Sequence, residues 1–123
     1  MKKFIYILIF TLSLCLTNNS FSAGTSNTSS DSSYTKAYNL IKSAKKYEKK
    51  GKTEKAQKKY IKAQKLLLKS NKEKPLQADT LNYLGFTTRK LGDYKKGEEF
   101  YLQGLQIDPS HKGINEYLGE LYV

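Results

Sequence analysis

A pattern that restarts after 34 residues in the C-terminal half constrains the fold of this chain more than any other feature. Leu84-Gly85 recurs as Leu118-Gly119, and Thr88 occupies the slot that Tyr122 fills. A fixed period of about 30–35 residues is typical of stacked helix pairs, in which each unit buries its apolar face only against neighbouring units. We therefore expect an all-α protein, an α-solenoid of antiparallel helix pairs.

The unit over residues 78–111 carries the most complete version of the pattern. Its spaced positions are Leu81, Leu84-Gly85, Gly92-Asp93-Tyr94, Tyr101 and Pro109. These positions resemble the tetratricopeptide repeat (TPR) family, and the chain looks like a small exported bacterial member of it. Gly85 is expected to be small because the paired helix approaches closely there. Gly97 and Gly104 stand where the family usually has Ala, so replacing either by Ala should stabilise the fold if the methyl group fits.

An earlier repeat covers residues 37–75 and is anchored on Gly51. Its consensus positions are Leu40, Ala44, Tyr47, Ala56, Tyr60 and Ala63. Gly51 and Gly92 are 41 residues apart, seven more than the period of 34, and we place the insertion in the second helix. A third repeat begins at Lys112 and supplies one helix. The expected architecture is about two TPR repeats plus a final helix.

Helix boundaries follow from the apolar spacing and from the residues that end and cap helices. The expected helices are 34–50, 53–73, 77–91, 94–107 and 111–122. Gly51 and Gly92 suit the left-handed conformation that ends a helix. Thr53, Asp93 and Ser110 are expected to cap the helices that follow them.

The N-terminus has the order of charges and apolar residues found in secretory signal peptides. Lys2-Lys3 precede an apolar run over residues 4–16, and a polar stretch follows. We expect a signal peptide over residues 1–22, a flexible Ser/Thr-rich linker over 23–33 and a TPR helical domain over 34–123. This organisation predicts an exported, soluble periplasmic protein.

The residues around Cys15 allow two alternatives for the cellular location of the protein. Leu12-Ser13-Leu14-Cys15 resembles a bacterial lipobox, although Leu14 is large where a small residue is usual. A lipoprotein and an N-terminally anchored protein are therefore the alternatives to periplasmic export. Cleavage after Ser22 would leave a mature chain with no cysteine, and so with no disulfide.

Positive charge is concentrated in the first repeat. Residues 36–74 hold fifteen Lys and three Glu, a net charge of +12, whereas residues 76–123 have five basic and seven acidic side chains, a net charge of −2. Such asymmetry indicates either an ordinary solvated helix surface or an anionic partner. Few arginines and no groove-reading motif are present, so nucleic acid is not expected as a partner.

The sequence carries no recognisable catalytic or metal-binding pattern. His111 is the only histidine, and we expect it to be a solvated loop residue. Glu98 and Glu99 are adjacent on a helix and point in different directions. No nucleophile–base pair and no phosphate-binding glycine loop is present. We expect a non-enzymatic protein with no cofactor and no metal.

The resemblance implies that the first helix of each repeat lines a concave groove. The corresponding positions are Tyr38, Ile41, Lys45, Lys49, Asp79, Asn82, Phe86, Arg89, Lys90, Glu116 and Glu120. We select Lys45, Asn82, Phe86, Arg89 and Lys90 as partner-binding residues. Asn82 would hold the backbone of a peptide, Arg89 its charge and Phe86 an apolar side chain. A solvated position on the helix is the alternative for Asn82.

The function that follows is a scaffold or adaptor in the cell envelope, binding a peptide or a partner protein in the groove. The alternative is a basic protein that binds anionic lipid or polymer on the envelope surface through its Lys-rich first repeat. The apolar C-terminal segment around Leu121 also predicts weak self-association. Tyr47, Tyr60, Tyr101 and Tyr122 fall in core positions of the family, so we expect them to pack inside.

Overall fold

Every regular element in the structure, a computed structural model that describes residues 28–123, is an α-helix. The helices are α1 (Thr28–Lys49), α2 (Thr53–Glu73), α3 (Ala78–Lys90), α4 (Tyr94–Ile107) and α5 (Lys112–Leu121). The expected all-α class is confirmed. The expected signal peptide and Cys15 lie outside the described residues, and no described helix is both long and apolar enough to cross a membrane.

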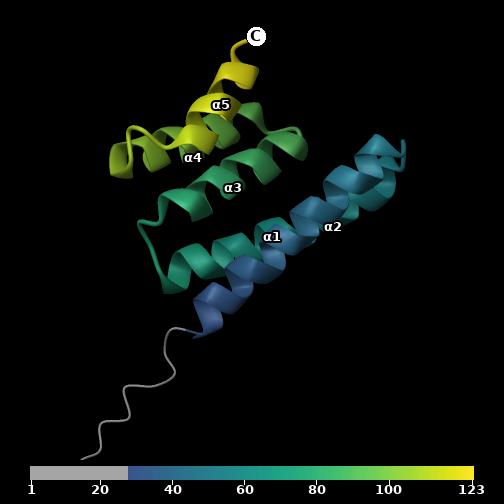
Figure 1. The fold of residues 1–123 in the computed structure, drawn as a ribbon, viewed down its shortest axis with the longest axis horizontal. Helices are drawn as coiled ribbons and strands as arrows, with labels where there is room; N and C mark the ends of the chain where they lie inside the picture. The colour runs from purple at the N-terminus through teal and green to yellow at the C-terminus, as the bar shows by residue number, and fades with distance from the viewer. Residues whose placement is uncertain (1–27) are drawn as a thin grey trace, which may run out of the picture.

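The helices stack as successive pairs. α1 and α2 form a long hairpin, α3 and α4 form a second hairpin, and α5 packs on the second (Figure 1). α3 contacts α1 and α2 as well as α4 and α5, so it is the central helix of the stack. The architecture is therefore an α-solenoid of helix pairs with a final single helix, as the repeat period predicts.

The seven extra residues of the first repeat lie in its second helix. α2 has 21 residues and α4 has 14. The expected bounds of these two helices agree with the structure at both ends. α3 and α5 are each one residue shorter at either end than expected.

The turns after α1 and α3 use glycine in the left-handed region. Gly51 has a φ of +68° and Gly92 a φ of +99°, as expected. Asp93 caps α4, because its side chain accepts a hydrogen bond from the backbone N–H of Lys96 at 3.0 Å. The expected cap at Thr53 is wrong, since Lys52 occupies the cap position of α2 and no side chain bonds to the free N–H groups there.

The start of α1 also differs from expectation. We predicted a flexible linker up to residue 33, but α1 begins at Thr28. Ser33 is only 5 % exposed and lies four residues before Ala37, in the row of α1 that continues with Ile41 and Ala44. A small side chain that fits this buried row allows the helix to start earlier than its polar composition indicates.

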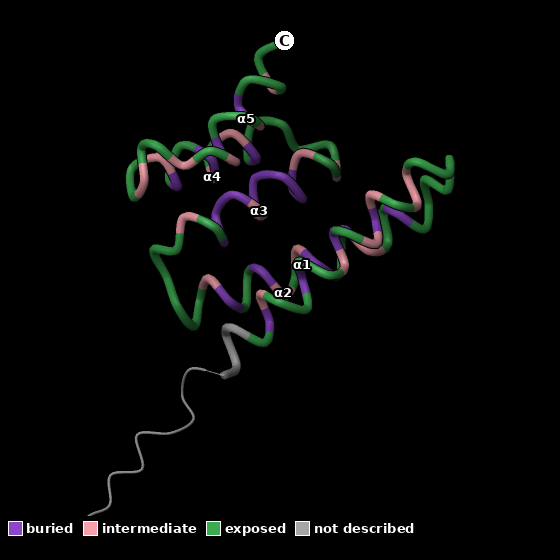
Figure 2. Tube along the Cα trace, viewed as in Figure 1, coloured by how far each residue is buried: buried purple, intermediate pink, exposed green. Residues whose placement is uncertain are grey.

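The core runs along the centre of the stack. Burial is greatest on α3, where most residues from Thr80 to Thr88 are buried (Figure 2). Tyr60 and Tyr101 are fully enclosed, as the family positions predict. Tyr47 is only partly buried, and Tyr122 is 64 % exposed because it follows the end of α5 and no described element covers it. The core assignment of Tyr122 is therefore wrong.

Glycines set the distance between α3 and α4. A Cβ atom at Gly85 would meet the ring of Tyr101, with Cδ1 at 2.5 Å. A Cβ atom at Gly97 would lie 3.0 Å from the backbone oxygen of Gly85 and 3.2 Å from the backbone nitrogen of Arg89. The close approach expected at Gly85 is confirmed. The gain expected from an Ala at Gly97 stays a prediction, because the methyl group would fit only if the backbone of α3 moved by a few tenths of an ångström.

Candidate partner-binding groove

One face of the molecule is built by α1, α3 and α5, the first helices of successive units. A hollow of about 260 Å³ on this face is lined from all three helices, and we call this region the groove. Its lining residues are Lys45, Glu48, Lys49, Phe86, Arg89, Lys90, Tyr117 and Glu120. Four of the five side chains selected from the sequence are thus brought together, and Asn82 is the exception.

Phe86 forms the floor of the groove. It is 2 % exposed, and its ring meets Tyr60 edge-on at 5.8 Å and Tyr117 at 4.9 Å between centroids. The ammonium group of Lys45 lies 4.5 Å from the centre of the Phe86 ring, within cation–π range. The expected role of Phe86 as an accessible apolar anchor is wrong, because tyrosines from two other helices cover the ring.

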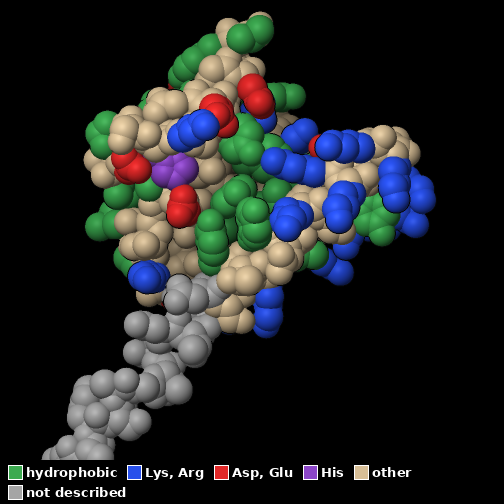
Figure 3. Space-filling view, viewed as in Figure 1, with side chains coloured by type: hydrophobic (Ala, Val, Ile, Leu, Met, Phe, Trp, Pro, Cys, Tyr) green, Lys and Arg blue, Asp and Glu red, His purple; other side chains and the backbone are tan. Residues whose placement is uncertain are grey.

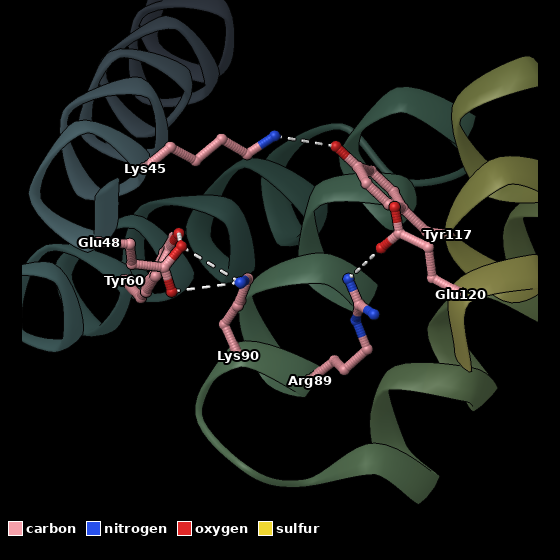
Figure 4. Close-up of polar contacts among 7 residues, drawn as sticks. All are labelled: Lys45, Glu48, Tyr60, Arg89, Lys90, Tyr117 and Glu120. Carbon is pink, nitrogen blue, oxygen red and sulfur yellow. Dashed lines mark hydrogen bonds and ion pairs between the residues drawn. The ribbon is translucent and has the colours of Figure 1, made fainter. Parts of the chain in front are cut away.

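Arg89 is committed to α5. Its guanidinium donates to Glu120 at 2.9 Å, and its side chain is only 13 % exposed (Figure 4). It also lies over the rings of Phe86 and Tyr117, at 5.8 and 5.7 Å. Burial raises the pKa of Tyr101, and the neighbouring positive charge of Arg89 opposes that shift. Arg89 therefore fastens α5 to α3 rather than presenting a free charge to a partner.

Lys90 and Lys45 bridge helices across the groove. Lys90 pairs with Glu48 of α1 at 3.2 Å, and Glu48 also accepts a hydrogen bond from the Tyr60 hydroxyl at 2.9 Å (Figure 4). Burial, and then the bond to Glu48, raise the pKa of Tyr60. Lys45 donates to the Tyr117 hydroxyl at 3.1 Å, which joins α1 to α5. The charges of the groove hold its walls together.

Asn82 lies beneath the start of α5. It is 5 % exposed, and a Cβ atom at Gly113 would be 2.9 Å from its amide nitrogen. Its side-chain oxygen has no hydrogen-bond partner among the described residues. Because α5 covers the side chain of Asn82, it is not free to contact a peptide backbone. For the same reason it is not a solvated residue of the helix surface.

His111 has a structural role that the sequence did not indicate. Its Nδ1 accepts a hydrogen bond from the backbone N–H of Ile114 at 3.1 Å, so it caps α5. Its Nε2 lies 2.7 Å from a carboxylate oxygen of Asp79, and its side chain is 13 % exposed. Because Nδ1 accepts a bond, the proton belongs on Nε2, which donates to Asp79. The expected solvated His111 and the expected cap at Ser110 are both wrong.

A tyrosine cluster lies on the same face and was missed as a group. Tyr34 and Tyr38 on α1 meet Tyr83 on α3, with ring centroids 6.1 and 5.6 Å apart. Tyr38 is 38 % exposed, and the ammonium group of Lys42 lies 5.5 Å from its ring centre. Burial raises the pKa of Tyr83 to about 12, and Tyr38, Tyr117 and Asp79 add to the shift. Asp79, Tyr83, Phe86 and Lys90 recur at helical spacing on one side of α3. This spacing could have indicated that Tyr83 lies on the groove side of the helix.

The remaining positions assigned to the groove differ in exposure. Ile41 is 1 % exposed and belongs to the core, whereas Lys49 is exposed on the rim. Glu116 is exposed and lies 4.0 Å from Lys112 of its own helix. Hydrophobic side chains gather in the middle of the face drawn in Figure 3, between Lys side chains over α1 and α2 and acidic side chains on the side of α3 and α5.

Comparison with known proteins does not assign the chain to a family. No protein-family model matches it, and no curated protein sequence matches it significantly.

Proposed function

We propose that this protein is a non-enzymatic TPR-like scaffold of the bacterial cell envelope that holds a segment of a partner protein in the groove. The support is a sequence pattern of the repeat type together with a stack in which α1, α3 and α5 share one face. Export to the periplasm is part of the proposal and rests on the charged and apolar residues at the N-terminus.

The observation that carries the proposal is the exposed aromatic and cationic wall beside the hollow. Tyr38 presents a partly exposed ring, Tyr83 supports it from α3, and Lys42 lies beside it, while Lys45 lies over Phe86 in the hollow. Tyrosine contributes large contact area at a low cost in side-chain entropy, and it is enriched at binding interfaces. This wall therefore suits a partner segment with an apolar side chain and neighbouring carboxylates.

The residues that would touch the partner differ from those selected by spacing alone. Asn82, Phe86 and Arg89 support the walls from below, whereas Tyr38, Lys42, Lys45 and Lys49 are the groups within reach of a bound chain. Replacing Asn82 or Arg89 would disturb the packing of α5 as well as binding, so such variants cannot isolate recognition.

The proposal is tested with a partner captured by crosslinking in the native envelope. Tyr38→Ala with Lys42→Gln should weaken its binding by about 2 kcal/mol or more, because an exposed tyrosine is a frequent energetic centre of an interface and Lys42 lies beside its ring. The matched control is Tyr94→Ala with Lys95→Gln on α4, a helix that contributes nothing to the groove and whose Tyr94 is 62 % exposed. Equal losses of affinity in both double variants, or none in the first, would refute the assignment.

A further inference from the structure

The exposed side of α2 carries two rows of lysines at seven-residue spacing. Seven residues make about two helical turns, so each row runs nearly parallel to the helix axis. The rows are Lys55, Lys62 and Lys69, and Lys58, Lys65 and Lys72, all of them exposed. Charge of one sign is thereby spread along most of a helix of 21 residues.

These lysines differ from Arg89 and Lys90 of the groove because almost none has an acidic partner among the described residues. Lys69 pairs with Glu73 at 3.8 Å, and no other lysine of the two rows forms an ion pair with a described residue. In the groove, by contrast, Arg89 and Lys90 are both paired with glutamates. The positive charge of α2 is therefore available to attract an external anion.

Apolar side chains accompany the lysine rows on both flanks. Ile61 and Leu68, also seven residues apart, are 40 % and 47 % exposed on one flank. On the other flank Leu40 and Tyr47 of α1 face a hollow of about 270 Å³ that four lysines of α2 rim. The ammonium groups of Lys55 and Lys59 lie 5.9 and 5.5 Å from the ring centre of Tyr47. Lysines alternating with exposed apolar groups are typical of helices that lie in a membrane interface.

We propose that this side of α1 and α2, which we call the basic face, docks on the surface of an anionic phospholipid bilayer. The lysines would meet headgroup phosphates, while Ile61, Leu68 and Tyr47 would enter the boundary between headgroups and acyl chains. The two extended rows fit a broad anionic surface better than a single small ion. The flanking apolar groups would gain little from a soluble polyanion, and this favours lipid.

The basic face is distinct from the groove, which α1, α3 and α5 form. Lys side chains spread over α1 and α2 beside the central hydrophobic patch in Figure 3. One molecule could therefore sit on a membrane through α2 and hold a partner segment through its groove. The two interactions are independent, so loss of membrane docking would not remove partner binding in the groove, and the reverse also holds.

The test is sedimentation of the purified full chain with phosphatidylcholine vesicles, with and without phosphatidylglycerol. Each lysine near an anionic bilayer contributes roughly five-fold in partitioning, so Lys58→Gln, Lys62→Gln and Lys65→Gln together should reduce binding on the order of 100-fold. The control, Lys95→Gln, Lys96→Gln and Lys112→Gln, changes the net charge equally outside the basic face and should lower binding only a few-fold.

A second variant tests the apolar flank. Ile61→Ser with Leu68→Ser should abolish the binding that remains at high salt, where lysine contacts are screened. Tyr38→Ala with Lys42→Gln beside the groove should lower vesicle binding no more than the triple lysine control does. Equal losses in the two triple lysine variants would overturn the proposal. Binding to long-chain polyphosphate without any binding to anionic vesicles would also overturn it.

Discussion

The two helix pairs of this protein are built on one plan but packed with different small residues. Alanines separate α1 from α2, where Ala37, Ala44, Ala56 and Ala63 are all buried. Glycines separate α3 from α4, where Gly85 and Gly97 bring the backbones closer and leave room for the ring of Tyr101. Each pair therefore encloses one tyrosine ring, Tyr60 in the first and Tyr101 in the second, and the pairs differ in the small residues that face it.

The pairs also differ in how they use charge. α2 leaves most of its lysines without a described acidic partner, whereas α3 and α5 are joined by Arg89–Glu120 and by His111–Asp79. The first pair therefore carries, on its outer helix, positive charge that is unpaired among the described residues, whereas the charged groups of α3 fasten α5 to the second pair.

The largest expected effect is loss of stability at alkaline pH, which should involve both pairs. Burial raises the pKa of Tyr60 in the first pair and of Tyr101 in the second above the ordinary value of about 10. Above that pH the unfolded chain releases protons that the folded chain retains, so stability is kept below pH of about 10 and falls as the pH rises.

Denaturant unfolding against pH measures this effect. Each buried tyrosine should contribute a slope of about 1.4 kcal/mol per pH unit. Tyr60→Phe and Tyr101→Phe should each remove one such contribution. If only Tyr60→Phe or only Tyr101→Phe reduced the slope of unfolding free energy against pH, the two pairs would not bury their tyrosines equally.

The glycine packing of the second pair predicts opposite results for two substitutions of the same kind. Gly85→Ala should destabilise by about 2–3 kcal/mol, because the new methyl group overlaps the fully buried ring of Tyr101. Gly119→Ala in α5 should stabilise by about 0.5–1 kcal/mol, since no atom outside the neighbouring backbone of its own helix lies within 4 Å of its Cβ position. Thermal denaturation of both variants decides the matter, and an unchanged melting temperature for Gly85→Ala would contradict the close approach.

The link between α3 and α5 through His111 should be worth about 1 kcal/mol. His111→Ala removes the cap of α5 and the bond to Asp79, so it should destabilise by about 1–2 kcal/mol. His111→Asn should recover part of the loss, because Asn is a good cap residue. Ser110→Ala is the control and should change little, since Ser110 bonds only to Asp108. A greater loss of stability for Ser110→Ala than for His111→Ala would show that Ser110 caps α5, as expected from the sequence.

The smallest effect is expected where the two pairs meet on the groove side. Lys90 and Glu48 are both about one-third exposed, so their ion pair is screened by water and salt. Lys90→Gln should lower the free energy of unfolding by no more than about 0.5 kcal/mol. A loss several times larger would show that this bridge, and not the apolar core, joins the first pair to the second.

Local signals were sufficient to predict most of the fold. Gly51 and Gly92 marked the ends of α1 and α3 because left-handed backbone favours glycine. The excess of seven residues over the repeat period placed an insertion in α2, whose 21 residues confirm it. These features depend on neighbouring residues in the chain and can be read without tertiary contacts.

The site was harder to predict because exposure depends on which helix covers which. Helical spacing places Asn82 and Phe86 on the groove side of α3, but α5 and the rings of Tyr60 and Tyr117 cover them. Likewise, nothing local distinguishes Ser110 from His111 as a cap. Only the position of Asp79, 32 residues earlier, fixes the histidine ring.

The central claim, that the groove holds a partner, is tested most directly by a photoreactive amino acid placed at Tyr38. In the native envelope this position should crosslink to a defined partner on irradiation, and Tyr94 on α4 should not. Competition by an excess of the groove-intact protein should remove the crosslink, whereas the Tyr38→Ala, Lys42→Gln variant should not compete. Absence of any crosslink at Tyr38, or an identical product at Tyr94, would contradict the account.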